Sequence, residues 1–357
     1  MNKPHLAQLK ELIKAQGLDA YLITDAVHGL YLSGFTGTNC WLLITADAQN
    51  YFITDFRYRE QARAEVNGFE VVIQEQSVFQ TLGQLIKQDG INKIGVDQDE
   101  LTLAVYARLN EEIAGIVFVP LPNPAKKIRK VKSAEELQLI KRAVEIADKA
   151  YLHLLDYLRP GITEKEVAFE LEFFMRRLGG TRNAFETIVA SGERAALPHG
   201  VATNKVLHAG EMVVLDFGTV YQGYHSDMTR TLFLGEPDAR AQEIYQVVLE
   251  AQERALKHIQ PGMRANEADL LARQIISDAG YGDYFGHGLG HGVGLEIHEA
   301  PSLSPRDETI LEPGMIVTVE PGIYLPGWGG IRIEDMVFVS PGGCDILTRS
   351  PKNFKLQ

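Results

Sequence analysis

The second half of the chain repeats a short pattern, and this repeat limits the folds that the chain can adopt. One copy, R-P-G-I-T-E-K-E-V, begins at Arg159, and a similar segment, Q-P-G-M-R-A-N-E-A, begins at Gln260. Each Pro-Gly pair precedes a predicted helix, and the two helices end at glycines, Gly179 and Gly280. The two copies lie close to one hundred residues apart, which indicates two related halves.

A second pair of segments repeats at a similar offset. Residues 210–218 read G-E-M-V-V-L-D-F-G, and residues 314–322 read G-M-I-V-T-V-E-P-G. Each is an apolar strand that ends in a carboxylate, Asp216 in the first and Glu320 in the second. Two α+β halves that face each other place these carboxylates at equivalent points. The repeat therefore predicts a site with pseudo-twofold symmetry.

A glycine-rich stretch from Tyr284 to Pro301, Y-F-G-H-G-L-G-H-G-V-G-L-E-I-H-E-A-P, carries His287, His291 and His298. Each glycine in a helix costs about 1 kcal/mol relative to alanine, so a looped or extended backbone is expected. His287 and His291 then lie roughly 13 Å apart, at about 3.3 Å per residue, and only one of them can bind a given ion. The spacing does not say which one. An ordinary glycine-rich turn is the weaker interpretation, because it leaves three histidines unexplained.

Two further carboxylates follow the repeated strands. After Asp216 the chain turns through Y-Q-G-Y and returns with Asp227, and after Glu320 it turns through L-P-G-W-G-G and returns with Glu334. Adjacent strands are about 4.8 Å apart, so each hairpin brings two carboxylates together. Taken singly, each is more often a turn, cap or strand-end residue. Four that point inward repel one another unless cations bind between them, and two divalent metals about 3.5–4 Å apart would also activate a bridging water.

Length and composition place the chain among globular proteins of two domains. It has 357 residues, 45% of them hydrophobic and 23% charged, with a net charge of −12 and no basic block that would favour a nucleic-acid partner. Neither a signal-peptide core nor an apolar run of about 18 residues is present, which predicts a cytoplasmic protein with no membrane partner. The two cysteines, Cys40 and Cys344, lack the spacing of a metal or redox site.

The first part of the chain alternates helices and strands, which predicts an α/β layer domain over residues 1–125. Helices are expected over 5–16 and near 77–88. Short buried strands are expected at 20–24, 41–45, 51–54, 68–73, 93–97 and 116–120. Prolines and basic residues at 120–132 indicate a linker to a second domain over residues 126–357.

The order L-D-F-G, S-D-M-T-R-T, G-H-G-L-G-H-G-V-G-L-E-I-H-E, V-E-P-G-I-Y and I-R-I-E-D resembles the pita-bread (M24-type) metallopeptidases. Within that group it most resembles Xaa-Pro aminopeptidases and Xaa-Pro dipeptidases (prolidases). The segments Y-L-S-G-F-T-G and T-D-F-R-Y-R-E-Q-A are similar to the creatinase-type N-terminal domain. The resemblance implies an α+β fold class, in which a C-terminal pita-bread fold with a pseudo-twofold repeat follows an α/β creatinase-type domain.

The resemblance also implies roles for particular residues. It resolves the histidine ambiguity in favour of His291, and it makes five residues the metal ligands: Asp216, Asp227, His291, Glu320 and Glu334. Glu320 doubles as the general base or proton carrier. His199 and His298 match the non-ligand catalytic histidines, which orient the peptide and stabilise the tetrahedral intermediate. His287 and Arg332 match residues on the substrate side.

The resemblance also implies cofactors and partners. Oxygen and imidazole ligands suit two Mn²⁺ ions, with Co²⁺ or Zn²⁺ as alternatives. The partner is a peptide substrate with proline at the second position, and the assembly expected from relatives is a homodimer.

The function favoured by the overall likeness is an Xaa-Pro aminopeptidase, and the alternative is an Xaa-Pro dipeptidase. Arg332 could pair with the terminal carboxylate of a dipeptide, whereas an open cleft end would favour longer peptides. Three further alternatives are weaker. Methionine aminopeptidases usually lack a creatinase-type first domain, creatinase-like hydrolases have lost the ligand pattern, and a non-catalytic binding module does not need all five ligands.

Overall fold

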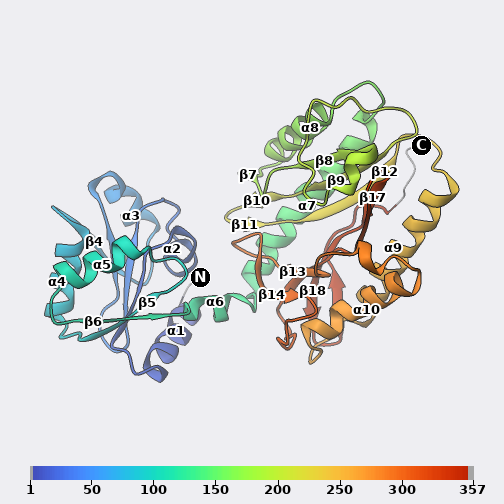
Figure 1. The fold of residues 1–357 in the computed structure, drawn as a ribbon. Helices are drawn as coiled ribbons and strands as arrows, with labels where there is room; N and C mark the ends of the chain where they lie inside the picture. The colour runs from blue at the N-terminus through green and yellow to red at the C-terminus, as the bar shows by residue number, and fades with distance from the viewer. Residues whose placement is uncertain (1–2, 353–357) are drawn as a thin grey trace. The chain divides into compact units, whose positions relative to one another are not determined.

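The structure is a computed structural model, and it describes residues 3–352. The chain divides into two compact units, Met1–Arg129 and Lys130–Gln357. Figure 1 labels the helices and strands of both units.

A six-stranded mixed sheet, in the order β4-β3-β2-β1-β5-β6, organises the N-terminal unit. Its strands are β1 (Ala20–Ile23), β2 (Trp41–Thr45), β3 (Tyr51–Thr54), β4 (Glu70–Ile73), β5 (Lys93–Asp97) and β6 (Val117–Leu121). Its helices are α1 (Lys3–Ala15), α2 (Ala26–Ser33), α3 (Arg59–Glu65), α4 (Val78–Gln88), α5 (Leu103–Glu112) and α6 (Pro124–Arg129), with a 3-10 turn η1 (Phe56–Tyr58). Leu82 and Ile86 of α4 and Leu109 of α5 share one apolar core with the sheet. The predicted α/β layer is confirmed.

The predicted linker over residues 120–132 contains a short helix, α6, and the two compact units divide at its end. Asn123 Oδ1 accepts a hydrogen bond from the backbone N–H of Ala125 at 2.9 Å, which satisfies one of the first N–H groups of the helix. Pro124 suits the first helical position, since its missing N–H has no partner to lose there. Proline therefore starts a helix here. The helices α2 and α5 are also additional to those that the sequence predicts.

The C-terminal unit is built from two halves. The first half contains α7 (Ala134–Tyr157), α8 (Glu164–Arg177), β7 (Arg182–Asn183), β8 (Ile188–Ser191), η2 (Gly192–Ala196), β9 (Met212–Phe217), β10 (Thr219–Tyr221), β11 (Tyr224–His225) and β12 (Met228–Phe233). The second contains α9 (Ala239–His258), α10 (Ala265–Asp278), η3 (Gly282–Tyr284), β13 (Gly290–Gly292), β14 (Glu299–Leu303), β15 (Ile316–Val319), β16 (Gly322–Leu325), β17 (Gly329–Arg332), β18 (Asp335–Ser340) and β19 (Gly343–Ile346).

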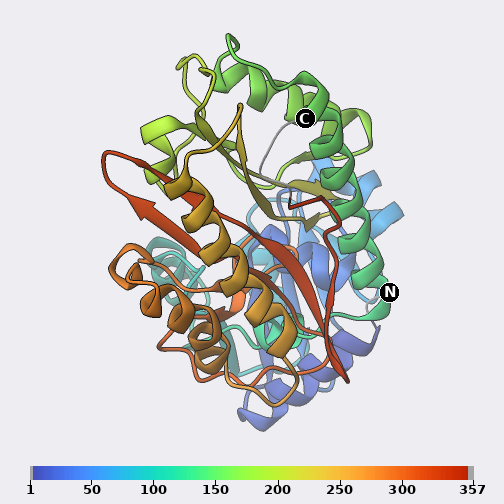
Figure 2. The ribbon, with the colours of Figure 1, turned by 90° about the vertical axis from the view of Figure 1, so that its right-hand side faces the viewer.

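The predicted repeat is present in the arrangement of these elements. In the first half, α7 and α8 pack on the strands β8, β9 and β12, and in the second half α9 and α10 pack on β15 and β18. Figure 2 shows α9 and α10 in front of the strands of the C-terminal unit. Capping boxes at Ser133 with Glu136 and at Thr163 with Glu166 begin α7 and α8. The mixture of helices and sheets confirms the α+β class.

The two carboxylate hairpins are bent rather than continuous. Strands β9 and β12 pair first, and the chain then continues as the separate pair β10–β11; β15–β18 and β16–β17 follow the same plan. Asp216 lies within β9, but Asp227, Glu320 and Glu334 lie at the breaks between strands. At the first break, a Cβ on Gly218 would meet the backbone O of Ser226 at 1.9 Å, so only glycine permits the close approach.

The loop that carries His199 is tied down at both ends by one buried carboxylate. Glu164, in the first turn of α8, is 0% exposed. Its Oε1 accepts from the N–H of Ser191 at 2.9 Å and from Ser191 Oγ at 2.8 Å. Its Oε2 accepts from the N–H of Thr203 at 3.0 Å and from Thr203 Oγ1 at 2.6 Å. The loop between these two residues therefore has a defined start and end.

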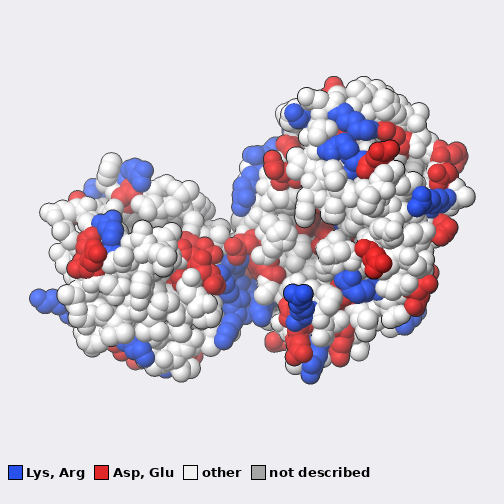
Figure 3. All heavy atoms as spheres, in the orientation of Figure 1, with Lys and Arg blue, Asp and Glu red and all other residues white. Residues whose placement is uncertain are grey.

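Within residues 3–352, no helix combines the length and the apolar character that a membrane crossing requires. On the face shown in Figure 3, acidic and basic side chains are intermixed over the C-terminal unit, so the net charge is not gathered into one block on this face.

Replacing Glu164 with glutamine is expected to lower the free energy of unfolding by about 2 kcal/mol, because the amide NH₂ faces donors that have lost their acceptor. Urea unfolding of the variant measures this change. Glu193→Gln is the matched control, since Glu193 is exposed in the adjacent turn. Equal stability of the two variants would show that the loop does not depend on Glu164.

Candidate metal centre

All nine residues that the sequence singles out line one cavity of about 1310 Å³ in the C-terminal unit. They lie on elements from both halves: His199, Asp216, Asp227, His287, His291, His298, Glu320, Arg332 and Glu334. The structure therefore brings the whole predicted set together. Their roles remain predictions, but the structure shows which contacts hold these side chains.

Three of the predicted ligands form a compact group. Ligand atoms of Asp227, His291 and Glu334 lie within 4.8 Å of one another. His291 Nε2 lies 3.5 Å from Asp227 Oδ2 and 3.3 Å from Glu320 Oε1. Asp216 stands apart from this group, with one oxygen on Arg332 and with its Oδ1 buried and without a hydrogen-bond partner in the described chain. That open acceptor and the converging carboxylates fit divalent cations.

The extended backbone around His291 sets which ring nitrogen faces the carboxylates. The N–H of His291 donates to Thr318 Oγ1 at 3.0 Å, and its Nδ1 lies 3.1 Å from the carbonyl O of Gly292. An Nδ1–H that donates to this carbonyl leaves the Nε2 lone pair free for an ion. Glycine at 290 is required here, because a Cβ would meet Thr318 O at 2.0 Å. The prediction of a non-helical stretch is confirmed.

Arg332 is committed to the site rather than to solvent. It is 3% exposed, and its Nη2 donates to Asp216 Oδ2 at 2.5 Å. Its Nη1 donates to Tyr324 Oη at 2.8 Å and to the carbonyl of Pro198 at 3.3 Å. Its Nε donates to Thr229 Oγ1 at 3.0 Å, and this hydroxyl in turn donates to Glu334 Oε2 at 2.7 Å. Arg332 thus orients two carboxylates of the predicted ligand set.

Sequence patterns do not reveal Tyr324. Its hydroxyl lies 2.9 Å from His287 Nε2 and accepts from Arg332, so it joins two predicted site residues. The segment G-I-Y-L after V-E-P reads as an ordinary apolar strand, and only the pairing of β16 with β17 brings the tyrosine near Arg332. No spacing rule could have found it.

Two residues of α10 hold the glycine-rich stretch in place, and the sequence analysis misses both. Asp269 is 1% exposed and accepts from the N–H of Leu289 at 3.0 Å. Arg273 makes a two-point ion pair with Asp269 and donates to the carbonyls of Phe285 at 2.9 Å and His287 at 2.7 Å. Helical i,i+4 spacing of Asp and Arg is the available signal, but it is common on helix surfaces.

The acid–base state of the site reflects its crowding. Burial raises the pKa of Asp227 and of Glu334 well above the usual range, and neighbouring carboxylates add to the rise. Burial raises the pKa of Glu320 to about 7, although Arg332 opposes the rise. Burial lowers the pKa of His291, which keeps the imidazole neutral. These shifts favour the protonated carboxyl groups, and a divalent ion would favour the charged carboxylates and displace any protons that they hold.

A second group with ligand-type side chains, Asp25, His28 and Asp97, lies in the N-terminal unit. Its histidine is already engaged at both ring nitrogens. His28 Nδ1 lies 2.8 Å from Asp25 Oδ1, and Arg129 Nη1 lies 3.1 Å from His28 Nε2. Arg129 therefore supplies the positive charge that a metal would bring.

The sequence matches the models of two protein families. Residues 138–341 match the model of metallopeptidase family M24, and residues 5–131 match that of the Creatinase/Prolidase N-terminal domain. The chain belongs to metallopeptidase family M24. The predicted family resemblance, its two fold types and the enzyme class are thereby confirmed.

Relatives of this M24 metallopeptidase carry two kinds of name. A solved Xaa-Pro dipeptidase from Bacillus anthracis is 46% identical, with a TM-score of 0.97 and 99% of each chain covered. A solved X-Pro aminopeptidase from Thermotoga maritima is 40% identical, with a TM-score of 0.91 over 98% of this chain and 99% of that one. The Xaa-Pro dipeptidase of Pyrococcus horikoshii is 39% identical over 344 residues, which is 96% of each chain.

Glu320→Gln is expected to change the pH dependence of stability in the metal-free M24 metallopeptidase. The folded-state pKa of Glu320 is about 7 against an ordinary 4.5, so the wild type loses stability as pH rises through this window. Glutamine has no such loss, and the advantage of the variant should grow by roughly 3 kcal/mol between pH 5 and pH 8. Urea unfolding with a chelator at both pH values measures it. A difference independent of pH would contradict it, and Glu193→Gln serves as the exposed control.

Arg273→Ala is expected to lower the free energy of unfolding by about 2–3 kcal/mol, because it leaves the buried Asp269 carboxylate and two loop carbonyls without donors. Thermal or urea unfolding measures the change. Arg254→Ala, an exposed arginine on α9, is the matched control and should differ little from wild type. A small effect at Arg273 would mean that the glycine-rich stretch holds its shape unaided.

Proposed function

We propose that this chain is an Xaa-Pro dipeptidase, which hydrolyses the bond between an N-terminal residue and proline with the help of two divalent metal ions. The observation that carries the proposal is the convergence of Asp227, His291 and Glu334 within 4.8 Å at a cavity with further histidines on its walls. Relatives named Xaa-Pro dipeptidases, which match nearly the whole chain, support the substrate class.

The metal site is proposed to comprise Asp216, Asp227, His291, Glu320 and Glu334. When bound, two divalent ions supply Lewis acidity and lower the pKa of a water towards neutrality. Mn²⁺ is the proposed ion, with Co²⁺ or Zn²⁺ as alternatives, since the donors are oxygens and one imidazole. The hydroxyls of Thr229 and Thr318 hold the carboxylates of Glu334 and Glu320 in place.

The remaining residues act on protons and on the peptide. Glu320 is suited to receive a proton and pass it to the proline nitrogen, because a carboxylate with a raised pKa serves as base and acid near neutral pH. The ring centre of His298 lies 4.4 Å from that of His291, and His298 is placed to donate to the developing oxyanion. His199 lines the same cavity. His287, held by Tyr324, is placed to contact the substrate.

An Xaa-Pro aminopeptidase is the second candidate, and one specific observation favours it. Arg332 is the only lysine or arginine among the described residues that line the cavity. Four of its five N–H groups already bond Asp216, Tyr324, Pro198 and Thr229. This leaves little capacity for the terminal carboxylate of a dipeptide, whereas a longer peptide needs no such partner.

Three further features belong to the proposal. The homodimer, the cytoplasmic location and the division into residues 1–125 and 126–357 stay predictions of the sequence and its resemblance.

The deciding measurement compares kcat/KM on Xaa-Pro, Xaa-Pro-Yaa and Xaa-Ala-Yaa with Mn²⁺ present. A dipeptidase is expected to prefer Xaa-Pro over the proline tripeptide at least tenfold. The reverse preference would establish the aminopeptidase, and equal rates on the alanine and proline tripeptides would reject proline specificity. Asp227→Asn is the inactive control, since it removes a carboxylate from the compact ligand group.

A further inference from the structure

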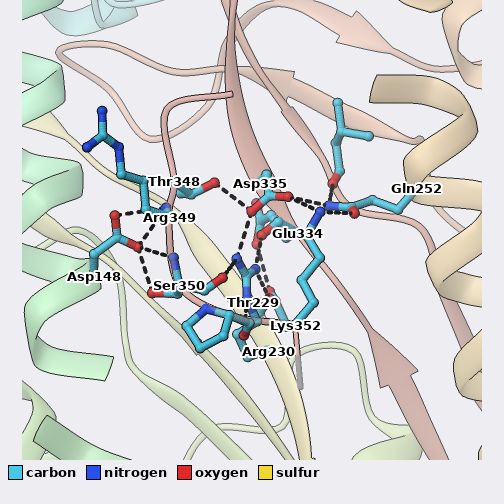
Figure 4. Close-up of polar contacts among 12 residues, drawn as sticks. Asp148, Thr229, Arg230, Gln252, Glu334, Asp335, Thr348, Arg349, Ser350 and Lys352 are labelled. Atoms are coloured by element: carbon cyan, nitrogen blue, oxygen red, sulfur yellow. Dashed lines mark hydrogen bonds and ion pairs between the residues drawn. The ribbon is translucent and has the colours of Figure 1, made fainter. Parts of the chain in front are cut away.

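A buried ionic network lies directly behind the candidate metal centre. Its centre is Arg230 on β12, which is 1% exposed and heads the largest fully buried side chains of the described chain. Arg230 Nη2 bonds Asp335 Oδ1 at 2.7 Å and the carbonyl of Ser350 at 2.8 Å, and its Nε bonds the carbonyl of Pro351 at 3.3 Å. Figure 4 shows these groups meeting from β12, β18 and the C-terminal segment.

Asp335, the first residue of β18, is the anionic partner, and its carboxylate is fully surrounded. It is 1% exposed. Besides Arg230, Oδ1 accepts from Thr348 Oγ1 at 2.6 Å, while Oδ2 accepts from Gln252 Nε2 at 2.9 Å and lies 2.6 Å from Lys352 Nζ. A buried ion pair is tolerated only when its remaining donors and acceptors are satisfied, and here most of those partners come from the C-terminal segment.

The C-terminal segment, residues 348–352, is anchored independently on α7. Asp148 accepts from the backbone N–H of Arg349 at 2.9 Å and from that of Ser350 at 2.8 Å, and Ser350 Oγ donates to it at 2.6 Å. Lys352 Nζ also donates to Gln252 Oε1 at 2.7 Å, and its carbonyl accepts from Tyr245 Oη at 2.8 Å. The segment is thus tied to α7 and α9 on either side of Asp335.

The network touches the backbone of the predicted ligands but not their carboxylates. Arg230 Nη1 donates to the carbonyl of Thr229 at 2.9 Å and to that of Glu334. The N–H of Glu334 donates to Thr229 O at 3.1 Å. Gln252 Nε2 also lies 3.4 Å from the carbonyl of Val319, the residue before Glu320. Arg230 therefore joins β12 of one half to the Glu334 turn of the other.

We propose that residues 348–352 act as a strap that holds Arg230 and Asp335, and through them the backbone of Glu334, in the arrangement that lets Glu334 and Asp227 share a metal ion. Lys352 and Thr348 are positioning residues, since neither contacts a ligand side chain. The inference rests on the proposed metal centre and deepens it, because it assigns a task to a segment far from the ligands in sequence.

The test measures the Kd of Mn²⁺ alone by isothermal titration calorimetry on full-length variants. Lys352→Met removes the cation on Asp335 Oδ2, and Thr348→Val removes the hydroxyl on Oδ1. Loss of such outer contacts weakens metal binding by about tenfold or more, so both variants should show a raised Kd. Lys257→Met, an exposed lysine on α9, is the matched control and should bind as wild type does.

Separate outcomes address the strap and the metal centre. A Kd within twofold of wild type in Lys352→Met, with lowered thermal stability, would show that the segment only stabilises the fold and would overturn the inference. If Lys352→Met does not fold, the Kd of Thr348→Val decides the question by the same criterion. Failure of the wild type itself to bind Mn²⁺ would reject the proposed metal centre instead.

Discussion

The mutual repulsion of buried carboxylates is the constraint on which the rest of the C-terminal unit depends. Burial and neighbouring charges raise the pKa of Asp227, Glu320 and Glu334 together, so their charged forms are costly unless a cation compensates for them. Each break in the bent hairpins lets a carboxylate leave its strand and point inward. The pseudo-twofold repeat explains why each half contributes two of the four carboxylates, one before its turn and one after it.

Positive charge is placed so that it orients these carboxylates without neutralising all of them. Arg332 pairs with one oxygen of Asp216 and leaves the other buried and open. Arg230 bonds backbone carbonyls and Asp335, and none of its hydrogen bonds goes to a predicted ligand side chain. The two arginines lie on strands of opposite halves, so each half is braced by a guanidinium that reaches across to the other. Low-dielectric surroundings make such bonds strong and their loss expensive.

The sequence predicted those features of the fold and the site that depend on local patterns. The repeated strands predicted four inward carboxylates, and the glycine-rich stretch predicted a histidine beside them. The family resemblance, and not a local pattern, singled out His199 and Arg332 and assigned the roles of the three histidines of the stretch. All of these residues line one cavity. Tyr324, Arg273 and Arg230 escaped for a physical reason. Their tasks arise from contacts between segments far apart in the chain, such as Arg230 with Asp335, and no period in either segment records the partner. The bend at Gly218 also depends on the close approach of two strands, which composition alone does not show.

The proposed hydrolysis and the length of the substrate depend on different parts of the cavity. The spacing of the predicted ligands and the environment of their carboxylates carry the proposed activation of a water. Substrate length depends on what meets the far end of the peptide, where Arg332 is the single cation on the described lining and is largely engaged. Names of relatives favour a dipeptidase, whereas the hydrogen bonds of Arg332 favour a longer peptide. The residues that would hold the metal fit both proposed activities, so the length of the substrate has to be decided by groups at the far end of the cleft.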